Sequence, residues 1–172
     1  MTMKSAKLFF GVATLGVLLI GSTNSAQAAG SATANLAVSA IINSNCTITT
    51  LAVGFPAYDP IVTHAAANDD SSSGSVTITC TKGASTTIGL GQGLNYSGSN
   101  RMADGSANFL TYGLFQDAGR TKAWGNAAPN LPPAHIAADK NPLIVPVYGR
   151  IPSAQDLPAG TYNDTVVATV NF

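Results

Sequence analysis

The chain has 172 residues, with eight basic and eight acidic side chains, so its formal net charge is zero. Only 9% of the residues are charged and no basic run occurs, which excludes the electrostatic footprint of a nucleic-acid-binding protein. The low charge, with no glutamate at all, is unusual for a cytosolic enzyme and suits a β-rich protein with a polar or covered surface.

Residues 1–28 have the organisation of a secretory signal peptide. Lys4 and Lys7 precede an apolar run from residue 8 to residue 20, which is too short to span a bilayer comfortably. The small residues at 26 and 28 fit the cleavage rule, so the mature chain is predicted to start at Ala29 with 144 residues (172 minus 28), the length of one domain. A membrane anchor is the alternative, but no later segment is apolar and long enough to support it. Loss of the two lysines leaves six basic and eight acidic residues, a net charge of −2.

The start of the mature chain alternates between apolar and other residues, which predicts a half-buried strand over 32–42. One face of this strand carries Ala32, Ala34, Leu36, Val38 and Ala40. The last eight residues alternate in the same way, with Val166, Ala168, Val170 and Phe172 on one face. Because an unpaired strand edge is a template for pairing, two such strands at the ends of an exported chain predict strand exchange between molecules.

Short strands separated by turn residues are expected along the rest of the chain. Clusters of Gly, Pro, Asn, Asp and Ser predict loops at 69–74, 96–100 and 104–106 and breaks at 129–133 and 152–158. The remaining segments predict strands at about 45–53, 75–81, 85–91, 109–116, 143–151 and 161–172. Many short strands of this kind indicate an all-β sandwich or barrel.

The two cysteines, Cys46 and Cys80, are predicted to form a disulfide, because export takes the chain to an oxidising compartment. A catalytic or metal-binding thiol pair is the alternative, but the spacing is not that of a CxxC motif and no histidine lies nearby in sequence. The histidines, His64 and His135, both lie in alanine-rich loop-like contexts, and the scattered aspartates are explained by turns. No nucleophile motif or phosphate-binding loop occurs, so we expect neither an enzyme nor a cofactor.

Five segments together resemble the spore coat protein U domain family, which includes the subunits (pilins) of archaic chaperone–usher pili such as the Csu type. The resemblance covers the mature chain in the family's order and rests on INSNCTI at 42–48, GSVTITC at 74–80, LTYGLFQD at 110–117 with Arg120-Thr121, VPVYGRIP at 145–152 and PAGTYNDTV at 158–166. The chain departs from the family pattern at Phe115, where tyrosine is usual, and in the region 123–142, which is rich in Ala and Pro.

The resemblance implies an incomplete immunoglobulin-like β-sandwich that is completed by a donated strand. Residues 29–40 would be the N-terminal donor strand, filling the groove of another subunit with Ala34, Leu36, Val38 and Ala40, and residues 41–172 would be the pilin domain. The acceptor groove would be flanked by the C-terminal strand with Val166, Ala168, Val170 and Phe172. A periplasmic chaperone, held at the Phe172 carboxylate, would occupy this groove until an outer-membrane usher exchanged it for identical or related pilin subunits.

Two functions follow as hypotheses. The first is a structural pilus subunit, exported through the periplasm to a cell-surface fimbrium for surface attachment and biofilm formation, with no small-molecule substrate and no nucleic acid. The alternative is a monomeric secreted binding or coat module, in which residues 32–40 complete the sheet of their own domain. The sequence alone does not separate donation within one chain from donation between chains.

Overall fold

The computed structural model describes residues 29–172, so the predicted signal peptide lies outside the described residues. Eight β-strands and no helix occur in this part of the chain. The strands are β1 (Cys46–Leu51), β2 (Asp69–Cys80), β3 (Ser85–Gly93), β4 (Asn100–Ala103), β5 (Phe109–Phe115), β6 (His135–Ile136), β7 (Leu143–Ile151) and β8 (Val166–Asn171). Correspondingly, the described residues contain no helix that could cross a membrane.

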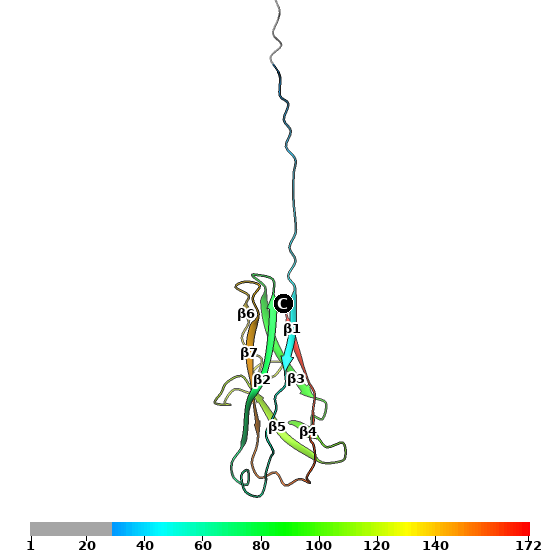
Figure 1. Cartoon of the computed structure of the whole chain (residues 1–172), viewed down its shortest axis with the longest axis vertical. Coiled ribbons are helices and arrows are strands. Elements are labelled where there is room, and N and C mark those ends of the chain that lie inside the picture. The colour runs from blue at the N-terminus through cyan, green and yellow to red at the C-terminus, as the bar shows by residue number, and fades with distance from the viewer. Residues whose placement is uncertain (1–28) are drawn as a thin grey trace, which may run out of the picture. The chain divides into compact units, whose positions relative to one another are not determined.

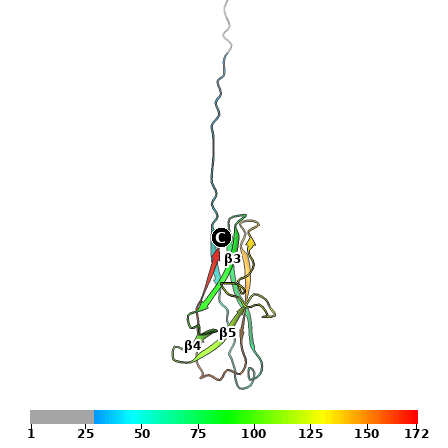
Figure 2. The ribbon, with the colours of Figure 1, turned by 180° about the vertical axis from the view of Figure 1, so that it is seen from behind.

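The strands form two antiparallel sheets that share one core. One sheet has the order β1-β2-β7-β5-β4 and the other has the order β6-β3-β8 (Figures 1 and 2). Most of the buried side chains between them come from β2, β3, β5 and β7, with Val76 and Ile151 only 1% exposed. This arrangement confirms the predicted all-β sandwich.

Alternation of side chains explains why these segments form strands. In β2, Val76, Ile78 and Cys80 are buried while Thr77 and Thr79 between them are partly exposed, as period-two geometry requires. The predicted disulfide joins Cys46, the first residue of β1, to Cys80, the last of β2, and these two residues also face each other in the β1–β2 ladder. The covalent bond therefore closes the end of an antiparallel pair whose register the apolar residues already set.

The strand predicted over 32–42 is not formed, since residues 29–45 belong to no strand. Its alternating pattern is real, but a strand needs a partner for its backbone groups, and residues 29–172 supply no partner strand to this segment. Residues 29–39 fall outside the domain, which comprises residues 40–172. Leu36 is 88% exposed and Val38 is 86% exposed.

The loop predicted at 69–74 is wrong, because β2 begins at Asp69 and pairs with β7 along this stretch. A bulge between Ser71 and Gly74 carries the extra residues, which explains why the composition resembles a loop. The last strand is shorter than predicted, at Val166–Asn171 instead of 161–172. The short strands β4 and β6 fall in segments where no strand was predicted.

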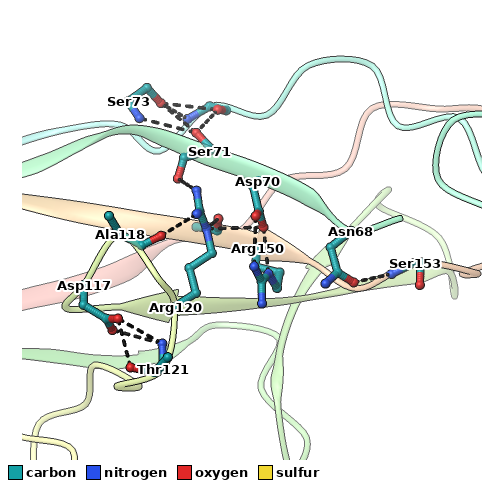
Figure 3. Close-up of polar contacts among 12 residues, drawn as sticks. Asn68, Asp70, Ser71, Ser73, Asp117, Ala118, Arg120, Thr121, Arg150 and Ser153 are labelled. Atoms are coloured by element: carbon teal, nitrogen blue, oxygen red, sulfur yellow. Dashed lines mark hydrogen bonds and ion pairs between the residues drawn. The ribbon is translucent and has the colours of Figure 1, made fainter. Parts of the chain in front are cut away.

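Two arginines hold the bulged half of β2 in place (Figure 3). Arg150 on β7 pairs with both oxygens of Asp70 through Nε at 2.7 Å and Nη2 at 2.9 Å, and this contact lowers the pKa of the Asp70 carboxyl more than nearby Arg120 does. Arg120 donates to the carbonyls of Gly149, Ser71 and Ala118 at 2.8–3.0 Å. Arg120 thus fastens the loop after β5 to β2 and β7.

A candidate strand-binding groove between β1 and β8

β1 and β8 lie close together at one side of the two sheets (Figures 1 and 2), and we call the region between them the seam. β1 is one of the two outer strands of the five-stranded sheet, and β8 is one of the two outer strands of the three-stranded sheet. Among the strand pairs of residues 29–172, none joins β1 to β8. Each strand therefore presents one edge of backbone N–H and C=O groups without a ladder partner, which is the arrangement that accepts an added strand.

A cavity of about 280 Å³ opens along this seam. Its floor consists of core side chains from four strands, namely Val76, Leu90, Leu114 and Val147. One wall is the end of β1 and the residues after it, from Thr50 to Val53 with Phe55, and the other wall is the start of β8. The cavity thus reaches the hydrophobic core, whose four floor side chains are 1–8% exposed, and an apolar segment laid between β1 and β8 would cover it.

The four predicted groove residues of the C-terminal strand differ in position. Val166 and Ala168 line the cavity, and Val170 is half-buried against the same core. Val167, on the opposite face, is 63% exposed, so the predicted alternation of β8 is present. Phe172 lies beyond the end of β8, is 55% exposed and does not line the cavity.

The sequence reasoning missed a polar contact at the floor of the groove. The Tyr112 hydroxyl donates to Asp164 Oδ2 at 2.7 Å, and Asp164 Oδ1 accepts from the backbone N–H and the side-chain amide of Asn95 at 3.3 and 3.2 Å. Burial, and then the Asp164 carboxylate, raise the pKa of Tyr112. Gly93 has no room for a side chain, because a Cβ there would collide with the Asp164 carboxylate. Tyr112 and Asp164 both line the cavity, and together they hold β5 to the segment that leads into β8.

The histidines have separate surroundings. His64 is buried, its Nδ1 accepts the Asp59 N–H at 3.0 Å, and its ring stacks on Tyr58 with centroids 4.8 Å apart. His135 is exposed on β6. Within residues 29–172, no three His, Cys, Asp or Glu side chains gather as metal ligands would.

Comparison with known proteins places this geometry in a family. The model of the Spore Coat Protein U domain matches residues 32–169. Protein U of Myxococcus xanthus is 38% identical over 158 residues, which cover 84% of this chain and 87% of that protein.

A solved structure shares the fold. One chain of the CsuC–CsuE chaperone–tip adhesion subunit pre-assembly complex, from archaic chaperone–usher Csu pili of Acinetobacter baumannii, superposes with a TM-score of 0.54 at 23% identity. The match covers 76% of this chain and 40% of that chain. The likeness fits an incomplete immunoglobulin-like sandwich, in agreement with the open seam between β1 and β8. By the extent of the domain match, the chain belongs to the Spore Coat Protein U domain family.

Proposed function

We propose that this protein is a structural pilus subunit that polymerises by donor-strand complementation. The proposal rests on one observation about the two parts of this chain. The groove between β1 and β8 lacks a strand, and residues 29–40, which alternate as a strand does, have no partner strand among the described residues. In the polymer, residues 29–40 of one copy lie between β1 and β8 of the next. Ala34, Leu36, Val38 and Ala40 then face the core of the acceptor.

The energy available to this exchange comes from two sources. Burying the exposed side chains of Leu36 and Val38 contributes about 1.5–3 kcal/mol each. Each hydrogen bond to the free edges of β1 and β8 adds about 0.5–1.5 kcal/mol. Ordering the arm and losing translational freedom oppose association, so a dry and preformed groove is what makes the exchange favourable.

An exported subunit with an open groove and two unpaired strand edges needs protection before it polymerises. We assign this role to a periplasmic chaperone that occupies the same seam, with the carboxylate of exposed Phe172 as its point of anchorage, and we assign exchange to an outer-membrane usher. The Csu complex is, by its description, a chaperone bound to a pilus subunit before assembly, which supports the chaperone part of the proposal. The product is a surface fimbrium that serves attachment and biofilm formation.

The description of the family as Spore Coat Protein U domain keeps a second candidate, a secreted coat module. In this alternative residues 32–40 fold back into the groove of their own domain, and the molecule is a stable monomer. Its groove would then be closed to a free peptide of residues 29–42, whereas an open or chaperone-held subunit would capture that peptide.

The natively secreted protein, compared unheated and boiled on a denaturing gel, distinguishes these functions. Polymers joined by whole strands give a ladder without heating that collapses to one subunit band on boiling. A single band in both lanes rejects the polymer. Deletion of residues 29–40 serves as the matched variant, because it should abolish the ladder and leave a subunit that a chaperone still binds.

A further inference from the structure

A tight turn between β1 and β2 presents two aliphatic side chains to solvent. Ile61 is 77% exposed and Val62 is 78% exposed. The turn lies at the end of the domain where β2 begins, since the His64 carbonyl accepts from Ala154 N, just past the end of β7. We name Ile61 and Val62 the apolar turn.

Hydrogen bonds of Asp59 and His64 fix the backbone of the apolar turn. The Asp59 carboxylate accepts the backbone N–H groups of Ile61 and Val62 at 2.9 and 3.2 Å, and these bonds lower the pKa of Asp59. The Asp59 carbonyl accepts from His64 N at 2.8 Å, and the buried His64 ring anchors the far side of the turn. A fixed backbone loses little freedom on binding, so its exposed side chains are suited to docking.

A second cavity, of about 180 Å³, lies at the opposite end of the domain. Ile78, Cys80, Ala137, Pro142 and Leu143 form its apolar walls. The loop that closes it is pinned, because Ala137 exchanges backbone hydrogen bonds with Gly83 and Ala84 and Asp139 accepts from Asn141 N at 2.7 Å. A cavity of roughly 150 Å³ already admits a ligand the size of benzene, so this one has room for an aliphatic side chain.

The cavity cannot take the apolar turn of its own chain. β2 has 12 residues and runs from the end that carries the turn to the end that carries the cavity, a distance of roughly 36 Å at strand rise. Any apolar turn that fills the cavity must come from another copy. The turn and the cavity lie at opposite ends of β2, which is the arrangement for head-to-tail contact.

We propose that the apolar turn of one subunit docks into this cavity of the next subunit along the fibre. The inference rests on the proposed strand exchange. The arm enters its own domain at Cys46, which is bonded to the cavity residue Cys80, so the arm root and the cavity share one end of the domain. If two subunits met through the ends at which residues 29–45 join the domain, neither copy would have that end free for a further subunit, and growth would stop. In an open fibre, this end of one subunit therefore meets the opposite end of its neighbour.

The tether between neighbours is short. If residues 29–40 lie in the acceptor, only residues 41–45 join them to β1, and five extended residues span at most about 17 Å. Such a tether gives an effective concentration on the order of millimolar. A contact too small to hold two free subunits together therefore forms within the fibre, where it sets the angle between adjacent subunits.

Cysteine pairs test the contact directly. The double variant Val62→Cys with Ala138→Cys places one thiol on the apolar turn and one on exposed Ala138 at the cavity rim. After mild oxidation of assembled fibres, we expect a ladder that survives boiling without reductant and collapses with reductant. The matched control, Val62→Cys with Thr49→Cys on the outer face of β1, and each single variant should collapse on boiling alone.

The outcomes separate the two proposals. A ladder before boiling, with no boiling-resistant ladder in the double variant, overturns the docking contact and leaves strand exchange standing. Equal crosslinking in the Thr49→Cys control overturns it as well. Absence of any ladder from the unmodified protein rejects strand exchange, and the docking contact with it.

Discussion

Tyr112 and Asp164 are 52 positions apart in the sequence, yet the Tyr112 hydroxyl donates a 2.7 Å hydrogen bond to the Asp164 carboxylate at the floor of the groove. The bond joins β5 of one sheet to the residues just before β8 of the other. No hydrogen-bonded ladder joins β8 to β1 across the seam. The Tyr112–Asp164 contact therefore helps to set the distance between these two strands.

Tyr112→Phe should therefore destabilise the domain by about 1.5–3 kcal/mol, the usual cost of removing a hydrogen bond to a charged group and leaving a carboxylate short of a donor. Urea unfolding of the chaperone-free subunit measures the change. Tyr162→Phe is the matched control, since that hydroxyl donates to the Pro158 carbonyl at the surface, and its effect should be smaller. Equal effects of the two changes would contradict a special role for the Tyr112–Asp164 contact.

A charge on the inward face of the donor segment should block polymerisation. Leu36→Asp or Val38→Asp brings a carboxylate into a dry groove at a cost of several kcal/mol, whereas Thr33→Asp lies on the other face and should be milder. The unheated gel measures the polymer in each variant. Equal ladders from all three variants would reject the proposed register of Ala34, Leu36, Val38 and Ala40.

Asp69 is 3% exposed, and its Oδ2 has no hydrogen-bond partner within the described chain. Burial raises the pKa of Asp69 in the fold, against a smaller lowering by His64, and the neighbouring Asp70 raises it further. A carboxyl with a raised pKa favours the fold when it is protonated, at a pH below its unfolded pKa, and this contribution is lost as the pH rises through the folded pKa. Asp69→Asn should therefore be more stable than the natural protein at pH 7 by about 1–3 kcal/mol, the cost of an unsatisfied buried polar group.

The pH dependence provides the check on Asp69. The difference in unfolding free energy between Asp69→Asn and the natural protein should shrink as the pH is lowered from 7 to 3. The aspartates that do not interact with Asp69 are common to both proteins and cancel in the difference, so the remaining pH dependence belongs to Asp69 and its neighbour Asp70. A difference that stays constant across this range would show that Asp69 does not titrate with the fold.

Arg120 should not be replaceable by lysine. Its guanidinium reaches three carbonyls and lies 3.3 Å from Asp70, and its side chain is only 12% exposed. Lysine has one compact ammonium and cannot reproduce this fork, so Arg120→Lys should cost about 1.5–3 kcal/mol in unfolding free energy. Lys122→Arg, on the exposed side of the same loop, is the control that should leave stability unchanged. A neutral Arg120→Lys would mean that charge alone fastens the loop.

The sequence predicts well those strands that have both an alternating apolar pattern and a neighbouring strand to pair with. β7 and the second half of β2 have apolar alternation and a neighbouring strand, and both occur where they were expected. The first half of β2 has the composition of a loop, and the residues that hold it in the sheet, Arg120 and Arg150, lie far away in sequence. Residues 32–42 show the reverse case, in which the pattern of a strand is present and its partner is absent.

The groove was predictable only in part for the same reason. The alternation of β8 indicates which side chains face inward, and Val166, Ala168 and Val170 do so. The opposite wall at Thr50 to Val53 and the pair Tyr112 and Asp164 depend on how two sheets meet, which no local pattern in the sequence reveals.

The disulfide determines where mechanical load enters the domain. Tension on residues 29–45 arrives at Cys46, and without a covalent link only the hydrogen bonds between β1, an outer strand, and β2 would carry it. The bond to Cys80 passes the load directly to the end of β2, which is flanked by β1 and β7 and must be sheared along its whole length to move. In a fibre of such domains, tension would therefore act on the contacts between neighbouring subunits before it separated the strands within any one domain.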